Sequence, residues 1–172
     1  YDLPLKRIEG KRVPMPESRP EATRSVALPF NDPELEWQWH YYNDGSLDPE
    51  LCKDGADINL LNAWKYTAGD NRVIVAVCDG GVMANHPDLA DNMWVNEAEM
   101  SGTAGVDDDG NGYVDDIYGV NTNELNGNIS WNNRRYDSEG NYTGDVGHGT
   151  HVAGIIAAVN NNGEGTSSIA GG

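Results

Sequence analysis

A run of six apolar residues, Val-Ile-Val-Ala-Val-Cys at 73–78, constrains the fold more than any other feature of the chain. The run is rich in β-branched residues, shows no alternation with polar side chains, and ends abruptly at Asp79-Gly80-Gly81. This pattern is typical of a strand in a parallel sheet, where both faces of the sheet are covered. The sequence therefore predicts a strand at 73–78 that is buried on both faces.

Helical periodicity is found on both sides of this predicted strand. Residues 57–68 place apolar side chains at helical spacing, with Asp57 as the expected N-cap and Gly69 as the expected stop. A second helix is expected after Gly147, because apolar residues recur there at i, i+3, i+4 and i+7. Those residues are Val152, Ile155, Ile156 and Val159. The order of helix, buried strand, long loops and helix predicts an α/β domain with a parallel sheet.

The first 30 residues differ in composition from the remainder. Residues 1–30 hold five of the 8 prolines and show no apolar period, which predicts an extended arm followed by a globular portion at 31–172. The whole chain carries a formal net charge of -17. An acidic surface of this kind repels nucleic acid and anionic membranes and favours cation binding. No segment of the sequence is long and apolar enough to predict a membrane span.

The two cysteines, Cys52 and Cys78, leave two interpretations open. They could form a disulfide. A small buried thiol is the favoured interpretation for Cys78, because this residue lies inside the apolar strand pattern.

Asp79 and His148 are the candidate catalytic residues. A carboxylate that directly follows a buried parallel strand lies at the sheet edge where ligands and catalytic groups gather, although Asp also begins many ordinary turns. His148 stands between two glycines at the start of the second predicted helix. A histidine that acts as a general base needs a carboxylate to orient it and to stabilise its cation. Asp79 could supply that carboxylate, 69 residues away in sequence, if the fold brings the two together.

A metal site at His148 and His151 is a weaker interpretation of the same stretch. Histidine pairs that bind metal on a helix usually stand at i and i+4 with a nearby Glu. The sequence His-Gly-Thr-His at 148–151 has neither feature.

Three motifs in order resemble the subtilisin-like serine peptidases, or subtilases. They are the strand and aspartate at 73–81, His-Pro-Asp-Leu at 86–89, and His-Gly-Thr-His-Val-Ala-Gly at 148–154. Gly80 stands where the family more often has Ser or Thr. The resemblance implies a three-layer α/β domain with a parallel sheet, present here as an incomplete N-terminal portion. It also implies that His148 is the general base and that Asp79 orients and stabilises it.

The family's remaining catalytic parts are not found in this sequence. The resemblance implies a nucleophilic serine at a Gly-Thr-Ser-x-Ala-x-Pro helix start and an oxyanion-hole asparagine, both after the histidine motif. Gly-Thr-Ser does occur at 165–167, but Ser167 follows His148 by only 19 residues and no proline follows it. Ser167 is therefore not expected to be the nucleophile, and the chain alone is expected to be inactive.

A second constellation lies in the acidic stretch at 105–119. Oxygen-bearing side chains alternate around a glycine there, which suits a calcium ion, although Tyr118 replaces the glutamate that would complete an EF-hand. The predicted calcium ligands are Asp107, Asp109, Asn111, the Tyr113 carbonyl, Asp115 and Asp116. Some subtilases carry a calcium loop of this kind between the aspartate and the histidine. The alternative is a solvated acidic loop.

These features predict a calcium-stabilised, secreted or cell-envelope serine endopeptidase that acts on protein or peptide substrates. Its expected partners are the C-terminal remainder of the catalytic domain and an inhibitory propeptide whose junction would fall in residues 1–30. The alternative is a non-catalytic calcium-binding or interaction module derived from a peptidase.

Overall fold

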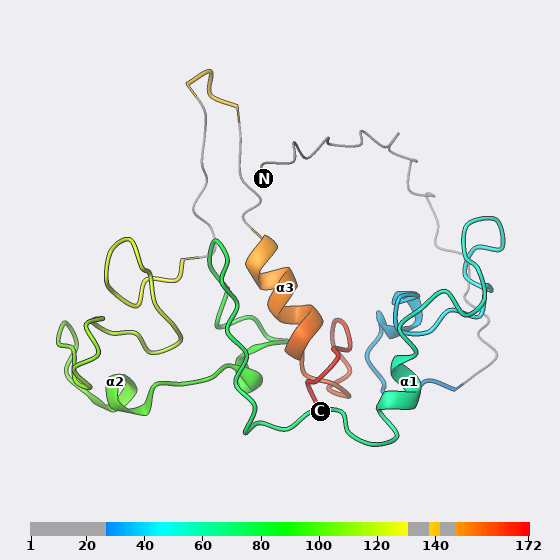
Figure 1. The fold of residues 1–172 in the computed structure, drawn as a ribbon, viewed down its shortest axis with the longest axis horizontal. Helices are drawn as coiled ribbons and strands as arrows, with labels where there is room; N and C mark the ends of the chain where they lie inside the picture. The colour runs from blue at the N-terminus through cyan, green and yellow to red at the C-terminus, as the bar shows by residue number, and fades with distance from the viewer. Residues whose placement is uncertain (1–26, 131–137, 142–146) are drawn as a thin grey trace, which may run out of the picture.

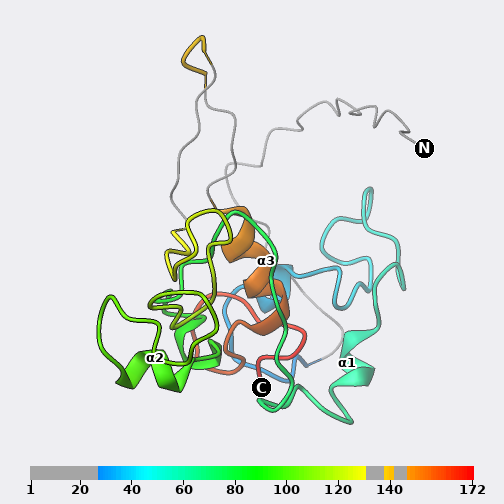
Figure 2. The same ribbon diagram turned by 60° about the vertical axis from the view of Figure 1, so that its left-hand side comes forward.

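The computed structural model describes residues 27–130, 138–141 and 147–172. Most of the predicted arm at 1–30 thus lies outside the described residues. The helices of the described part are two 3₁₀ helices, η1 (Leu35–Trp37) and η2 (Ala90–Asn92), and three α-helices, α1 (Leu60–Ala63), α2 (Glu97–Ser101) and α3 (His148–Ala157). Helix α3 lies between the part of the chain that carries α1 and the part that carries α2 (Figures 1 and 2). No helix in these ranges is long and apolar enough to cross a membrane.

The structure confirms the helix predicted after Gly147. Gly147 is the N-cap of α3, and the helix runs for 10 residues to Ala157. Gly149 and Ala153 are its buried residues. Small side chains on this face let other segments come close to the helix axis, which matters at the site described below.

The helix predicted at 57–68 is much shorter than expected. Only Leu60–Ala63 is α-helical, and its N-cap is Asn59 in a left-handed conformation with φ 56°. Asp57 does not cap the helix, because its carboxylate accepts hydrogen bonds from the backbone N–H groups of Asn43 at 2.8 Å and Asn59 at 2.6 Å. The side chain thus stabilises a turn at the point where the periodicity predicted the first helical turn.

The buried strand predicted at 73–78 is not formed. The described residues contain only two isolated bridges, both made by Asn126, and no segment pairs with 73–78. Val73, Ile74 and Val75 are 70%, 64% and 55% exposed. A strand depends on neighbouring strands for its hydrogen bonds and its cover, and the described segments supply none. The parallel sheet of the predicted α/β domain is therefore not seen here.

The two cysteines do not form a disulfide, and neither is buried. Cys78 is exposed, Cys52 is half-buried, and both are free thiols. The prediction of a buried Cys78 is wrong, because the strand that would have buried it lacks its neighbours.

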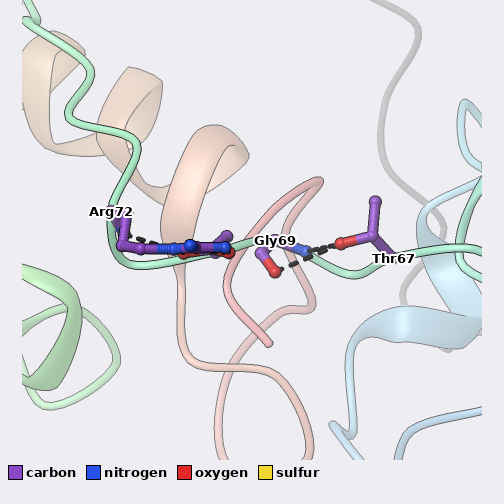
Figure 3. A network of polar contacts seen from close by, with 4 residues as sticks. Thr67, Gly69 and Arg72 are labelled. Carbon is purple, nitrogen blue, oxygen red and sulfur yellow. Dashed lines mark hydrogen bonds and ion pairs between the residues drawn. The ribbon is translucent and has the colours of Figure 1, made fainter.

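A polar turn leads into residues 73–78 and fixes their start near the C-terminal residues. The Gly69 N–H donates to the Thr67 hydroxyl oxygen at 3.1 Å, and Arg72 is paired with the carboxylate of Asp70. Figure 3 shows Thr67, Gly69 and Arg72 along this turn. Gly69 has φ +129°, and a Cβ at this position would lie 2.2 Å from the carbonyl oxygen of Ala170. Only glycine allows this close approach.

A small core joins the N-terminal described segment to α1. Leu35, Tyr41 and Leu60 are buried together, and Leu28, Phe30 and Trp64 pack against them. The rings of Phe30 and Trp64 meet edge-to-face at 4.9 Å between centroids. The Tyr41 hydroxyl also donates to the carbonyl of Ile155 at 3.3 Å, which ties this core to α3.

Candidate active site

The structure brings Asp79 and His148 into direct contact. The Nδ1 atom of His148 lies 2.6 Å from Oδ2 of Asp79, across 69 residues of sequence. His148 is the first residue of α3, and Asp79 directly follows the exposed segment 73–78. The contact is present although no strand pairs with 73–78 in the described part of the chain.

The environment of Asp79 favours its ionised form. The backbone N–H of Gly80 donates to Oδ1 at 2.6 Å, and this bond is the first cause that lowers the carboxyl pKa. The hydrogen bond with His148 is the second cause, and it lowers the same pKa further. An ionised carboxylate beside Nδ1 stabilises the tautomer that carries its proton on Nδ1, and leaves Nε2 free to accept a proton.

The histidine is open to a reacting molecule, while the aspartate is more protected. The side chain of His148 is 58% exposed and that of Asp79 is 20% exposed. An exposed imidazole that a carboxylate holds through one nitrogen is the arrangement that general-base catalysis needs.

Close packing of two glycines lets the Asp79 turn reach the helix start. A Cβ on Gly149 would lie 2.2 Å from the carbonyl oxygen of Gly81, and 3.1 Å from the Cβ of Asp79. Gly81 has φ +125° and is itself packed against the carbonyl oxygen of Ser130. Gly81 and Gly149, each within two residues of a candidate residue, are thus the points where the turn and the helix meet most closely.

His151 does not join this pair. Its backbone N–H donates to the Gly147 carbonyl within the first turn of α3, and its side chain is exposed. Its charge contributes to a lowered pKa of His40, for which burial is the larger cause. The His151 side chain thus interacts electrostatically with His40.

Ser167 is placed where it cannot serve His148. It is fully buried, and its hydroxyl donates to Oδ2 of Asp32 at 2.5 Å. The next residue, Ser168, donates to the carbonyl of Ala158, just past the C-terminal end of α3. His148 is at the other end of this helix, which is about 15 Å long at 1.5 Å per residue.

The acidic loop folds around a carboxylate that lies outside the predicted motif. Glu99, in α2, is only 5% exposed, and its oxygens accept hydrogen bonds from the N–H groups of Asp108, Asp109 and Asp115. Glu99, Asp107 and Asp109 each offer one carboxylate oxygen within 4.8 Å of the other two. Sequence reasoning missed Glu99, because nothing in its local pattern marks it and only the fold of α2 brings it to the loop.

Some of the other predicted ligands contact the cluster of Glu99, Asp107 and Asp109, and others contact different residues. Asn111 donates through its amide to both Asp109 and Asp116, at 3.1 and 3.0 Å, and Asn96 links the same two carboxylates from another segment. Hydrogen bonding by Asn96 is the first cause that lowers the pKa of Asp109. Asp115 has φ 53°, and its carboxylate accepts from the N–H of Gly105.

The position of Tyr113 in this loop is set by a short turn. Its backbone N–H donates to the Asn111 side-chain oxygen at 2.8 Å.

Comparison with known proteins identifies relatives of this chain. The model of the Subtilase family (Peptidase_S8) matches residues 70–172. Subtilisin-like protease 1 of Plasmodium vivax is 43% identical over 120 residues, which cover 68% of this chain and 17% of that protein. The protein of the same name from Plasmodium berghei is 36% identical over 81% of this chain and 19% of its own length. Furin-like protease 2 of Drosophila melanogaster is 33% identical over 76% of this chain and 6% of its own length.

The matched family region includes both candidate residues and the helix that carries the histidine. The chain spans about a fifth or less of the length of each of these relatives. On the family match and on these identities, the chain belongs to the subtilase family.

Proposed function

We propose that the protein is a serine endopeptidase in which Asp79 and His148 form the acid–base part of the catalytic machinery. The observation that carries this proposal is the 2.6 Å contact between Nδ1 of His148 and Oδ2 of Asp79. The ionised carboxylate and the exposed imidazole match the roles of orienting group and general base. Membership of the subtilase family supports the same roles.

In this mechanism the imidazole Nε2 of His148 takes the proton of a serine hydroxyl as that oxygen attacks the peptide carbonyl. Asp79 stabilises the imidazolium that forms, and the imidazolium then gives its proton to the leaving amine. We place the serine and the oxyanion-hole asparagine in the C-terminal remainder of the catalytic domain. The 172-residue chain alone is therefore expected not to hydrolyse peptide bonds.

The test uses the natural protein that contains this sequence. It compares two histidines of α3, His148 and His151. The measurement is the rate of casein hydrolysis by His148→Ala and by the matched control His151→Ala, which alters an exposed side chain one turn along α3. We expect His148→Ala to abolish hydrolysis and His151→Ala to keep most of it. If the two variants were equally active, the proposed role of His148 would be wrong, and a non-catalytic module would be the better account.

We further propose that the acidic loop binds calcium and stabilises the domain. The carboxylate oxygens of Glu99, Asp107 and Asp109 form a set of hard oxygen donors, which suits Ca²⁺. Asn111 and Asp116 adjoin this set through hydrogen bonds, and the Tyr113 carbonyl could add a neutral ligand. Asp115 is the predicted ligand that fits least well, because its carboxylate is turned to Gly105. Bound calcium would neutralise the mutual repulsion of these side chains.

Thermal unfolding with calcium and with chelator tests this site. At a calcium concentration 100 times the Kd, binding to the folded state alone adds about 2.7 kcal/mol of stability. We expect the wild-type chain and the control Asp91→Asn, an exposed position, to show this gain, and Asp109→Asn to lose most of it. Equal unfolding temperatures in calcium and chelator, with no heat of binding by calorimetry, would leave only a solvated acidic loop.

We also propose a secreted or cell-envelope location, protein or peptide substrates, and an inhibitory propeptide whose junction falls within residues 1–30. The acidic net charge of -17 suits a soluble peptidase that binds cations and avoids nucleic acid. Cell fractionation and N-terminal sequencing of the mature protein test the location and the junction. A cytoplasmic location would contradict the first proposal. A mature N-terminus outside residues 1–30 would contradict the second.

A further inference from the structure

The turn that carries Asp79 is attached to α3 at two points. The first is the contact of Asp79 with His148. The second is four residues later, where the backbone N–H of Met83 donates to the hydroxyl oxygen of Thr150 at 3.0 Å. Thr150 is half-buried in the first turn of α3, two residues after His148.

Two attachments constrain the turn where one would not. The Gly80 N–H and His148 hold the Asp79 carboxylate, but neither bond fixes the turn at Met83, four residues further along the chain. The side chains of His148 and Thr150 point in different directions from the helix, since residues at i and i+2 do not share a face. The turn therefore passes around the helix start, and the Thr150 bond fixes its far end.

The space between the two attachments is filled, so the turn cannot shift without breaking one of them. Gly149 lies against the Gly81 carbonyl with no room for a Cβ. On its other side the turn is held by a third segment, because the N–H of Val82 donates to the carbonyl of Ile129 at 3.3 Å.

We propose that Thr150 is a positioning residue for the catalytic pair: its hydroxyl holds the Met83 end of the turn so that the Asp79 carboxylate faces Nδ1 of His148. Thr150 does not touch the reacting atoms in this account. It acts through Asp79, by keeping the distance and orientation of the carboxylate.

The test uses a pair of variants that differ in one hydroxyl. Thr150→Val keeps the shape of the side chain and removes the acceptor, whereas Thr150→Ser keeps the acceptor. Proton and ¹⁵N NMR of the imidazole report the tautomer of His148 and its Nδ1–H hydrogen bond. We expect the wild-type chain and Thr150→Ser to show one tautomer with a hydrogen-bonded Nδ1–H, and Thr150→Val to show mixed tautomers. A wild-type imidazole spectrum in Thr150→Val would overturn the inference.

Two controls keep the result interpretable. Thr122→Val changes an exposed threonine of another loop and is expected to leave the imidazole spectrum unchanged. If Thr150→Val does not fold, Thr150→Ala removes the same acceptor without placing a branched apolar side chain at this half-buried position, and the same two outcomes apply to it.

Kinetics in the natural protein give a second readout, which rests on the proposed peptidase function. Misplacement of a catalytic group by about 1 Å costs up to roughly 100-fold in rate. We expect Thr150→Val to lower kcat by roughly 10- to 100-fold with little change in KM, and Thr150→Ser to restore it. If His148→Ala abolishes activity while Thr150→Val does not lower it, this inference fails and the proposed function stands. If His148→Ala has no effect, the proposed function fails, and the NMR experiment still tests Thr150.

Discussion

Asp32 accepts a hydrogen bond from the hydroxyl of Ser167 at 2.5 Å, although 135 residues separate them in sequence. The same carboxylate accepts from the backbone N–H groups of Asn161 at 2.9 Å and Asn162 at 3.1 Å. Gln38 adds a reciprocal pair with the Ser167 backbone, at 2.8 and 3.0 Å. The N-terminal described segment thus holds the loop that follows α3, and through it the C-terminal end of the helix.

We predict that Asp32→Asn destabilises the chain by about 1–3 kcal/mol, because the amide turns a donor toward N–H groups that need an acceptor. Asp32 is only 4% exposed, so water cannot replace the lost acceptor. The measurement is the free energy of unfolding by urea. Asp91→Asn, at an exposed position, is the control and should change this free energy by less than about 0.5 kcal/mol. Equal effects of the two substitutions would show that the Asp32 contacts contribute nothing.

Gly149 and Gly80 provide a second matched comparison. A Cβ on Gly149 would lie 2.2 Å from the Gly81 carbonyl oxygen, whereas a Cβ on Gly80 would meet nothing within 4 Å. We predict that Gly149→Ala destroys the contact between Asp79 and His148 and that Gly80→Ala preserves it. The Nδ1–H signal of His148 in the NMR spectrum checks both variants. A normal signal in Gly149→Ala would mean that the two backbones are not in close contact.

The sequence predicted α3 because the signals for a helix are local. Its apolar residues recur at helical spacing after Gly147, and every backbone hydrogen bond of a helix is made within a few residues. The strand at 73–78 was equally clear as a pattern, but a strand is completed by partners far away in sequence. The described residues supply no such partner, so the same reasoning was right for the helix and wrong for the burial of Cys78.

Sequence reasoning reached the candidate site only in part for a similar reason. Asp79 and His148 carry recognisable motifs, and the structure places them together. Glu99 has no motif and reaches the acidic loop only through the position of α2. Asp115 fits the spacing of a calcium loop, but its left-handed backbone turns the carboxylate toward Gly105. Spacing gives the order of the oxygen atoms along the chain and does not give their directions.

The pKa of Tyr41 gives an alkaline prediction. Burial raises this pKa from 10.0 to about 12, against a smaller opposite effect of the hydrogen bond with Gln38. A group whose pKa is higher in the folded state retains its proton there while the unfolded chain loses it, so stability falls as the pH rises from 10.0 toward about 12.

Tyr41→Phe should remove this part of the alkaline loss of stability. It should also cost about 0.5–1.5 kcal/mol at neutral pH, because the bond to the Ile155 carbonyl is lost. Urea unfolding at neutral pH and in the alkaline window measures both effects. Tyr66→Phe is the control, since Tyr66 is 91% exposed. Tyr66→Phe should lose stability with the same pH slope as the wild-type chain. The prediction fails if Tyr41→Phe also shows that slope.

The pKa of Asp79 gives an acidic prediction. The Gly80 N–H and then the His148 hydrogen bond lower it below 3.8. A carboxyl whose pKa is lower in the folded state stabilises the fold above the unfolded pKa, and this stabilisation is lost as the pH falls through the folded pKa. The ¹³C signal of the carboxyl should therefore titrate below pH 3.8. In His148→Ala its midpoint should rise only part of the way, because the Gly80 bond remains. A midpoint at or above 3.8 in the wild-type chain would contradict this prediction.

The most direct measurement is a double-mutant cycle on kcat for peptide hydrolysis, made with Asp79→Asn and His148→Ala in the natural protein. If the two residues act as one catalytic pair, Asp79→Asn lowers kcat by roughly 10⁴-fold because it favours the wrong tautomer of the histidine. The double variant should then be within roughly tenfold of His148→Ala alone, since residues that act as a unit have non-additive effects. Two losses that multiply in the double variant, or an Asp79→Asn variant with nearly normal kcat, would contradict the proposed role of this pair.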